Sequence, residues 1–284
     1  MKSKLLAFAL GLSVSISAFA NPVQSLPGGP LFVKFTGAEQ IAVNGANTGY
    51  ANEISWGVFT VDTLRKGVVV TPNAQISPSG PAFFSDGAGA QVTGIFYGVQ
   101  QGSPATAANP FPGALGYMDL YWRDMDAYSY TDMGAVSLNG PAGIRTSQST
   151  ATGFTDGTLL AHIVFTAGID PSNPTVTISG SQVPTQDGFT GQSDFFANID
   201  ITAGGAWADK LDTDFFNTAF GQADLKFKNS YNLLTQWSDP TNSNIIGAKI
   251  DDPAQAFALP EPGALALMGL ALVGMGAIRR RKQK

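Results

Sequence analysis

The feature that most limits how this chain can fold is the close spacing of glycine and proline along it. The 284 residues include 33 glycines and 17 prolines, and the runs between them are short and rich in β-branched and aromatic residues. Short runs of this kind, bounded by turn-forming residues, are typical of strands. We therefore expect an all-β protein with an antiparallel, β-sandwich-like body.

Several of these runs alternate between apolar and polar side chains. In "FANIDITA", Ala197, Ile199 and Ile201 oppose Asn198 and Asp200, so the strand has one apolar and one polar face. Residues 205–223 can support a short helix instead. The predicted strands are 31–43, 54–64, 67–72, 91–100, 116–124, 157–169, 175–183, 193–204 and 223–234.

The first twenty residues have the pattern of a secretory signal peptide. Lys2 and Lys4 precede an uncharged, mostly apolar run, and the small residues Ala18 and Ala20 follow it. This order of basic, apolar and small residues marks a chain for export and cleavage. We predict that 1–20 is a signal peptide and that an extracytoplasmic β-rich domain follows over 21–258.

The last segment, 259–284, combines an acidic turn, an apolar run and a basic cluster. Pro260, Glu261 and Pro262 precede sixteen uncharged residues, 263–278. A helix of that length reaches about 24 Å, which is short of the ~30 Å hydrocarbon core of a bilayer. By the positive-inside rule the basic end stays in the cytoplasm and the body lies outside. The basic residues are Arg279, Arg280, Arg281, Lys282 and Lys284.

This three-part order resembles the PEP-CTERM sorting signal of Gram-negative bacteria that make exopolysaccharide. The resemblance implies processing by an exosortase, a membrane transpeptidase-like enzyme that cleaves near the Pro-Glu-Pro. The apolar helix would then be a transient inner-membrane tether, and the released body would reach the cell surface or the extracellular matrix. An ordinary tail anchor with a proline-rich linker is the alternative. The residues that carry the sorting motif are Pro260, Glu261, Pro262, Arg279, Arg280 and Arg281.

The predicted body is acidic and lacks cysteine. Nine basic and twenty acidic residues lie between the two terminal segments, so the body carries a net charge of about −11. Nucleic acid is therefore a poor partner. The absence of cysteine excludes disulfides, thiolate metal sites and cysteine nucleophiles. His162 is the only histidine, so zinc sites with two or more histidines are excluded as well.

No cofactor is expected, and calcium is the one candidate ion. Asp124 and Asp126 place hard oxygen ligands at alternating positions, but the glycine and glutamate of an EF-hand loop are missing. A Ser-His-Asp triad would have to use His162, and no G-x-S-x-G motif accompanies it. We expect that the chain is not an enzyme.

Aromatic residues gather close to these acids and form a candidate carbohydrate-binding site. Tyr117, Tyr121, Trp122 and Tyr128 lie in one stretch, and carbohydrate-binding surfaces use exposed rings of this kind. Strand aromatics also pack in cores or pair across strands, and this alternative stays open.

The acidic body, rich in glycine, asparagine and phenylalanine, resembles the flocculation-associated PEP-CTERM proteins. That likeness implies a role with exopolysaccharide, in flocculation or biofilm. The alternatives are a secreted hydrolase that cuts polysaccharide with a carboxylate pair, and a passive surface-layer protein.

Overall fold

The computed structural model describes residues 23–50, 52–70, 75–87, 89–103, 105, 109, 111–133, 143–181 and 190–259. The signal-peptide residues Ala18 and Ala20, the Pro-Glu-Pro motif, the apolar run and the arginine cluster lie outside these ranges. Within these ranges, no helix is both long enough and apolar enough to cross a membrane.

The described chain consists almost entirely of antiparallel strands, which confirms the prediction of an antiparallel all-β protein. The strands are β1 (Gly29–Ala42), β2 (Glu53–Val70), β3 (Gln75–Ser85), β4 (Ala90–Gln101), β5 (Phe111–Ala114), β6 (Tyr117–Asp124), β7 (Arg145–Ser147), β8 (Thr150–Ala151), β9 (Thr158–Thr166), β10 (Ile178–Gly180), β11 (Thr190–Ile199), β12 (Phe216–Thr218), β13 (Gly221–Ala223), β14 (Leu225–Leu233) and β15 (Ile245–Ala258). The helical segments are α2 (Ala208–Leu211) and the 3-10 turn η1 (Thr235–Trp237).

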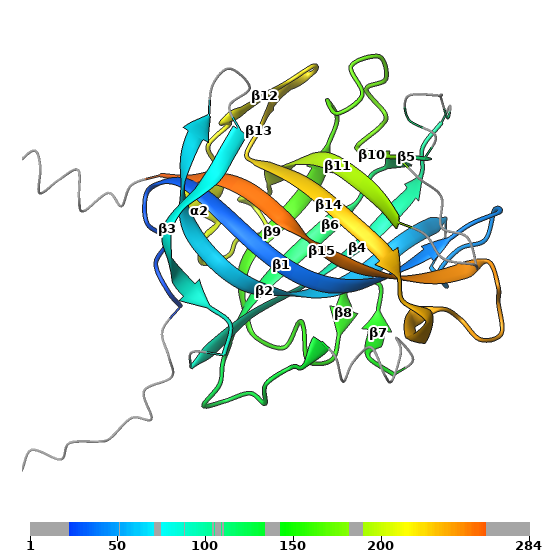
Figure 1. Ribbon diagram of the computed structural model, residues 1–284, viewed down its shortest axis with the longest axis horizontal. Coiled ribbons are helices and arrows are strands. Elements are labelled where there is room, and N and C mark those ends of the chain that lie inside the picture. The colour runs from blue at the N-terminus through cyan, green and yellow to red at the C-terminus, as the bar shows by residue number, and fades with distance from the viewer. Residues whose placement is uncertain are drawn as a thin grey trace, which may run out of the picture.

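Eight of the described strands form a sheet that closes on itself. They follow the order β2-β4-β6-β9-β11-β14-β15-β1, and β1 pairs again with β2. β3 pairs with β2 outside this ring, while β5 and β10 join β4 to β11 at one end. Figure 1 shows β1 and β15 in front of β4, β6 and β9, so two walls face each other as in a sandwich and join along both edges.

Several phenylalanine rings pack against one another inside the closed sheet. The Phe35 ring of β1 lies 5.4 Å from the Phe59 ring and 6.3 Å from the Phe227 ring, measured between centroids. Phe227 of β14 in turn stacks, at 4.4 Å, on Phe195, its direct cross-strand partner on the neighbouring strand β11. All four side chains are buried, and each burial stabilises the fold by roughly 2–3 kcal/mol. All four rings belong to the main hydrophobic core.

One patch of the outer face is covered by other parts of the chain. Trp56, Val58 and Ile95 project outward from β2 and β4, and Phe154 and Trp237 pack over them. The Trp56 and Trp237 ring centroids are 5.7 Å apart. An outer face this apolar needs such a cover, which explains why the segment around β7 and β8 and the η1 turn lie against the sheet (Figure 1).

The two ends of the described chain meet at one end of the closed sheet, beside α2. The start of β1 pairs with the end of β15, since Gly29 lies opposite Ala258. The Trp207 indole N–H donates to the Gln24 carbonyl at 2.7 Å, and the Leu259 backbone N–H donates to the carbonyl of Lys210 in α2 at 2.8 Å. This end is therefore closed by α2 and by the chain that enters β1.

Candidate functional site

Tyrosine side chains, a carboxylate and the only histidine gather on the outer face of β4, β6 and β9. We call this group the outer aromatic cluster. Alternate residues of β6 point outward, and the register between strands places Tyr97 opposite Tyr117 and Asp119 opposite His162. The cluster consists of Tyr97, Tyr117, Asp119, Tyr121 and His162.

Three rings of the cluster form a row across the strands. The Tyr117 ring lies between Tyr97, at 5.6 Å and an interplanar angle of 28°, and His162, at 5.9 Å and 18°. All three side chains are half-buried, so part of each remains accessible while the rings lie against each other. Offset stacking of this kind fixes the rings in place.

Asp119 sets the electrostatics of the outer aromatic cluster. Its Oδ1 lies 2.5 Å from Nδ1 of His162, and this hydrogen bond is the main cause that raises the pKa of the imidazole. Burial and then the Asp119 charge raise the pKa of Tyr121 to about 12 and also raise that of Tyr97. Both phenols are therefore protonated at neutral pH, and the cluster offers hydroxyl and imidazole groups beside a carboxylate.

Two of the four predicted carbohydrate-binding residues, Tyr117 and Tyr121, belong to this cluster, whereas Trp122 does not. Neighbouring residues of a strand point to opposite faces, so Trp122 points inward. Its side chain is 5% exposed, and its ring centroid lies 5.8 Å from that of Phe84. Trp122 is a core residue and cannot offer its ring to a ligand, which corrects that part of the prediction.

The fourth predicted residue, Tyr128, lies in the turn after β6 and packs against Arg123. The guanidinium carbon of Arg123 is 5.4 Å from the centre of the Tyr128 ring, within the range of a cation–π contact. The side chain of Tyr128 is half-buried. It stands apart from the row of rings and supports a polar network on the same wall.

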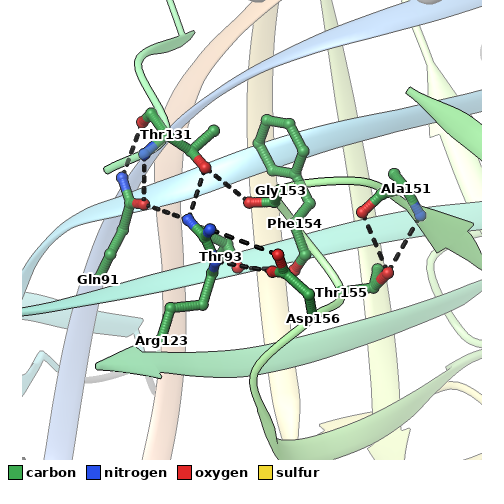
Figure 2. A network of polar contacts seen from close by, with 9 residues as sticks. All are labelled: Gln91, Thr93, Arg123, Thr131, Ala151, Gly153, Phe154, Thr155 and Asp156. Carbon is green, nitrogen blue, oxygen red and sulfur yellow. Dashed lines mark hydrogen bonds and ion pairs between the residues drawn. The ribbon is translucent and has the colours of Figure 1, made fainter. Parts of the chain in front are cut away.

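This network attaches the segment around β7 and β8 to the sheet (Figure 2). The Arg123 guanidinium donates to Gln91 Oε1 at 2.9 Å, to Thr131 Oγ1 at 2.5 Å and to Asp156 Oδ1 at 2.8 Å. The Gln91 amide bonds both the backbone N–H and the carbonyl of Thr131. Arg123 is only 3% exposed, and a charge so deeply buried persists only with partners of this kind. We assign the network a structural role.

A second buried ion pair joins β7 to β2. Arg145 donates to both carboxylate oxygens of Glu53, at 2.7 and 2.8 Å, and Glu53 has no exposed surface. The backbone N–H of Gly98 also donates to this carboxylate at 2.7 Å. The guanidinium lies 4.2 Å from the ring centres of both Tyr50 and Trp56. Each group of the pair therefore has several stabilising partners.

The predicted calcium ligands have other contacts. Asp124 accepts a hydrogen bond at 3.0 Å from the backbone N–H of Asp126, which caps the turn after β6, and Asp126 is exposed. Within the described ranges, no group of three or more histidine, aspartate or glutamate side chains is placed to hold a metal ion.

Sequence reasoning missed Tyr97, Asp119 and His162 as partners of the two tyrosines. The signal was present in the strand at 117–124, where Tyr117, Asp119 and Tyr121 alternate with apolar residues. Alternation alone places these three on one face. The neighbours on adjacent strands depend on register, which no single strand specifies.

Comparison with solved structures finds two crystal structures of Ail, the attachment invasion locus protein of Yersinia pestis, one of them in complex with the heparin analogue sucrose octasulfate. Each is 7% identical to this chain and covers 81% of it and 99% of the Ail chain, with TM-scores of 0.14 and 0.12. TM-scores this low do not indicate a shared fold. No curated protein matches the chain.

Residues 258–282 match the PEP-CTERM protein-sorting motif. The match confirms the resemblance seen in Pro260-Glu261-Pro262 and in the basic cluster that ends the apolar run. It begins at Ala258, the last residue of β15, so the motif follows the closed sheet directly. The chain is therefore an exported protein that carries a PEP-CTERM sorting motif and is sorted by an exosortase to the envelope or surface of a Gram-negative cell.

Proposed function

We propose that this chain is a non-enzymatic cell-surface or extracellular-matrix protein that holds exopolysaccharide, in flocculation or biofilm, through its outer aromatic cluster. The observation that carries the proposal is the row of Tyr97, Tyr117 and His162 beside Asp119. Sugar hydroxyls both donate and accept hydrogen bonds. The cluster offers both functions from rigid strands rather than from loops.

The fixed geometry of the cluster favours binding of a repetitive polymer. Cross-strand pairing and ring stacking hold these side chains in place, so little conformational entropy is lost when a sugar binds. Single contacts of this kind are weak. When one polysaccharide chain engages many copies of the protein, multivalency would raise the overall strength of binding.

A co-sedimentation experiment tests the proposal. The protein is recovered after expression of the full chain with its own signals and is mixed with exopolysaccharide from the producing cells. We expect the wild-type protein to pellet with the polysaccharide, and a Tyr117→Ala, Tyr121→Ala double variant to bind at least ~10-fold more weakly. Tyr130→Ala is the matched control, because Tyr130 is 54% exposed and lies outside the cluster.

Three outcomes separate this proposal from its alternatives. Failure to pellet, together with unchanged cell aggregation after deletion of the gene, would overturn it. Release of reducing sugar ends from the polysaccharide would favour the hydrolase instead. Self-association in the absence of sugar would favour the surface-layer protein. A parallel assay with a calcium chelator tests whether calcium bridges the acidic body to acidic sugars.

A further inference from the structure

A cavity of about 310 Å³ lies inside the closed sheet, at the end opposite α2. This volume is at the lower limit of sites that bind small molecules. The exposed residues Asn44 and Gln101 are among its lining residues, so the cavity reaches the rim of the sheet. Most of the wall is apolar and includes Phe35, Phe96, Met118, Phe165, Phe195 and Ile250.

Glu39 places a carboxyl group in this apolar wall. Alternation along β1 brings Phe35, Glu39 and Ile41 to the same inner face. The carboxylate accepts a hydrogen bond from the Ser55 hydroxyl. No lysine, arginine or histidine is among the described residues that line the cavity, so Glu39 has no cationic partner there.

Asn229 of β14 supplies a second acceptor to the same cavity. Its Oδ1 is buried and receives no hydrogen bond within the described part of the chain. Buried acceptors without a donor are unfavourable, because they have lost their bonds to water. The cavity thus combines an apolar wall with a carboxyl group that has no cationic partner and a buried amide oxygen that has no donor within the described residues.

The energetics of Glu39 point to a cationic occupant. Burial raises the pKa of its carboxyl to about 7, so at neutral pH the group is close to the balance between its two forms. An ionised carboxylate in an apolar pocket is stabilised by a positive charge close to it. A carboxylate ligand would be repelled, and a neutral alcohol would leave the charge of Glu39 without compensation.

We propose that the cavity binds a small, mainly apolar amine, whose ammonium group pairs with Glu39 and whose hydrocarbon part packs against the aromatic wall. The site lies inside the closed sheet, whereas the outer aromatic cluster lies outside it. The proposal therefore goes beyond polysaccharide binding, and each function can fail without the other.

Isothermal titration calorimetry with n-octylamine tests this site, with 1-octanol and octanoate as ligands of matched length. The protein is the form recovered after expression of the full chain. We expect one octylamine per protein, bound at least ~30-fold more tightly than octanol, and no detectable binding of octanoate. Glu39→Gln should lower the affinity for octylamine to that for octanol.

Asp194→Asn is the matched control variant. Asp194 lies between the cavity-lining residues Ser193 and Phe195, so its side chain points to the outer face of the same wall. Its amine affinity should stay within about twofold of the wild-type value. Equal affinity for octanol and octylamine, unchanged amine binding by Glu39→Gln, or no binding of octylamine would each overturn the proposal.

The pH dependence of wild-type binding provides a test that needs no variant. Among the described lining residues, Glu39 and Tyr231 of β14 are the titratable ones, while β2 and β15, which flank β1, contribute none. Phenols and alkylammonium groups titrate well above pH 8. Octylamine affinity should therefore rise from pH 6 to pH 8 as Glu39 ionises, and octanol affinity should not. A flat profile for octylamine would contradict the ion pair.

Discussion

At the scale of single residues, Glu39 links the stability of the fold to pH. Burial raises the pKa of its carboxyl from 4.5 to about 7. Between these values the folded protein retains a proton that the unfolded chain has released. Stability therefore falls as pH rises from about 4.5 through 7, and the cost of ionising Glu39 is fully present above that range.

Glu39→Gln should remove this pH dependence. The amide keeps the shape of the carboxyl without its charge, so we expect the variant to be more stable than wild type by about 3 kcal/mol at pH 8. The difference should disappear near pH 4, where the wild-type carboxyl is neutral in both states. Urea unfolding at the two pH values measures it. An equal difference at both would show that the side chain acts through packing rather than charge.

Glu53 and Arg145 form the ion pair whose loss should be most damaging. Because Glu53 is fully buried, Glu53→Gln leaves the Arg145 charge without its counter-ion. We expect a loss of about 3–5 kcal/mol in the free energy of unfolding. Lys34 and Asp251 provide the control, since they lie 3.6 Å apart with side chains 53% and 46% exposed. Asp251→Asn should change stability by less than ~1 kcal/mol, and comparable losses in both variants would contradict this account.

At the scale of elements, the pairing of β2 with β4 joins the two walls of the closed sheet. Each of these strands carries a phenylalanine that pairs with a glycine on the other strand. Phe59 of β2 pairs with Gly94, and Phe96 of β4 pairs with Gly57. A Cβ atom on Gly94 would lie 2.3 Å from Cζ of Phe59 and 2.6 Å from the carbonyl oxygen of Asp119. The missing side chains of these glycines are therefore what makes room for the rings.

Gly94→Ala should destabilise the fold by about 2–3 kcal/mol through this clash. Combining it with Phe59→Leu, which shortens the opposing side chain, should cost less than the sum of the two single changes by about 1 kcal/mol. Thermal unfolding of the wild type, both single variants and the double variant measures the coupling. Strict additivity would show that the ring and the glycine do not act as a pair.

Much of the strand content could be predicted from the sequence, because alternating β-branched and aromatic runs specify strands locally. Two of the long strands were not predicted, and neither were several strands of two to four residues. β15 contains Asp251, Asp252 and Pro253, which are typical of a turn. The ladder of β15 with β14 passes from Ala254 directly to Asp251, so the missing N–H of Pro253 falls where pairing is interrupted.

The other long strand that was not predicted, β3, contains Pro78 and Pro81, and among the described strands it pairs only with β2. An edge strand tolerates proline because one of its sides needs no partner. The predicted break between residues 64 and 67 was also wrong, since β2 continues unbroken from Glu53 to Val70. At these sites, pairing with strands that are distant in the sequence outweighs the local preference for a turn.

At the scale of the whole molecule, both termini of the described body lie at one end of the closed sheet, and the mouth of the cavity lies at the other end. β15 contains 14 residues and runs from Ile245, close to the rim of the cavity, to Ala258, where the sorting motif begins. At about 3.4 Å per residue this strand is roughly 45 Å long. A chain held at its C-terminal end would therefore place the cavity mouth away from its point of attachment.

Closure of the sheet is the property that is hardest to predict from the sequence. The contact between β2 and β4 forms only when every strand pair around the sheet has the correct register. The outer aromatic cluster is subject to the same limit, since it combines three strands. The sorting motif is different. Its signal is carried by contiguous residues, so it could be recognised without any knowledge of the fold.

The central claim is that the body is exported and separated from its C-terminal motif. The intact mass of the protein recovered from the producing culture tests it most directly. We predict a mass that begins at Asn21 and ends near Pro260, and we expect replacement of Pro260, Glu261 and Pro262 by alanine to leave the tail attached. A wild-type protein that retains residues 263–284 would contradict the claim.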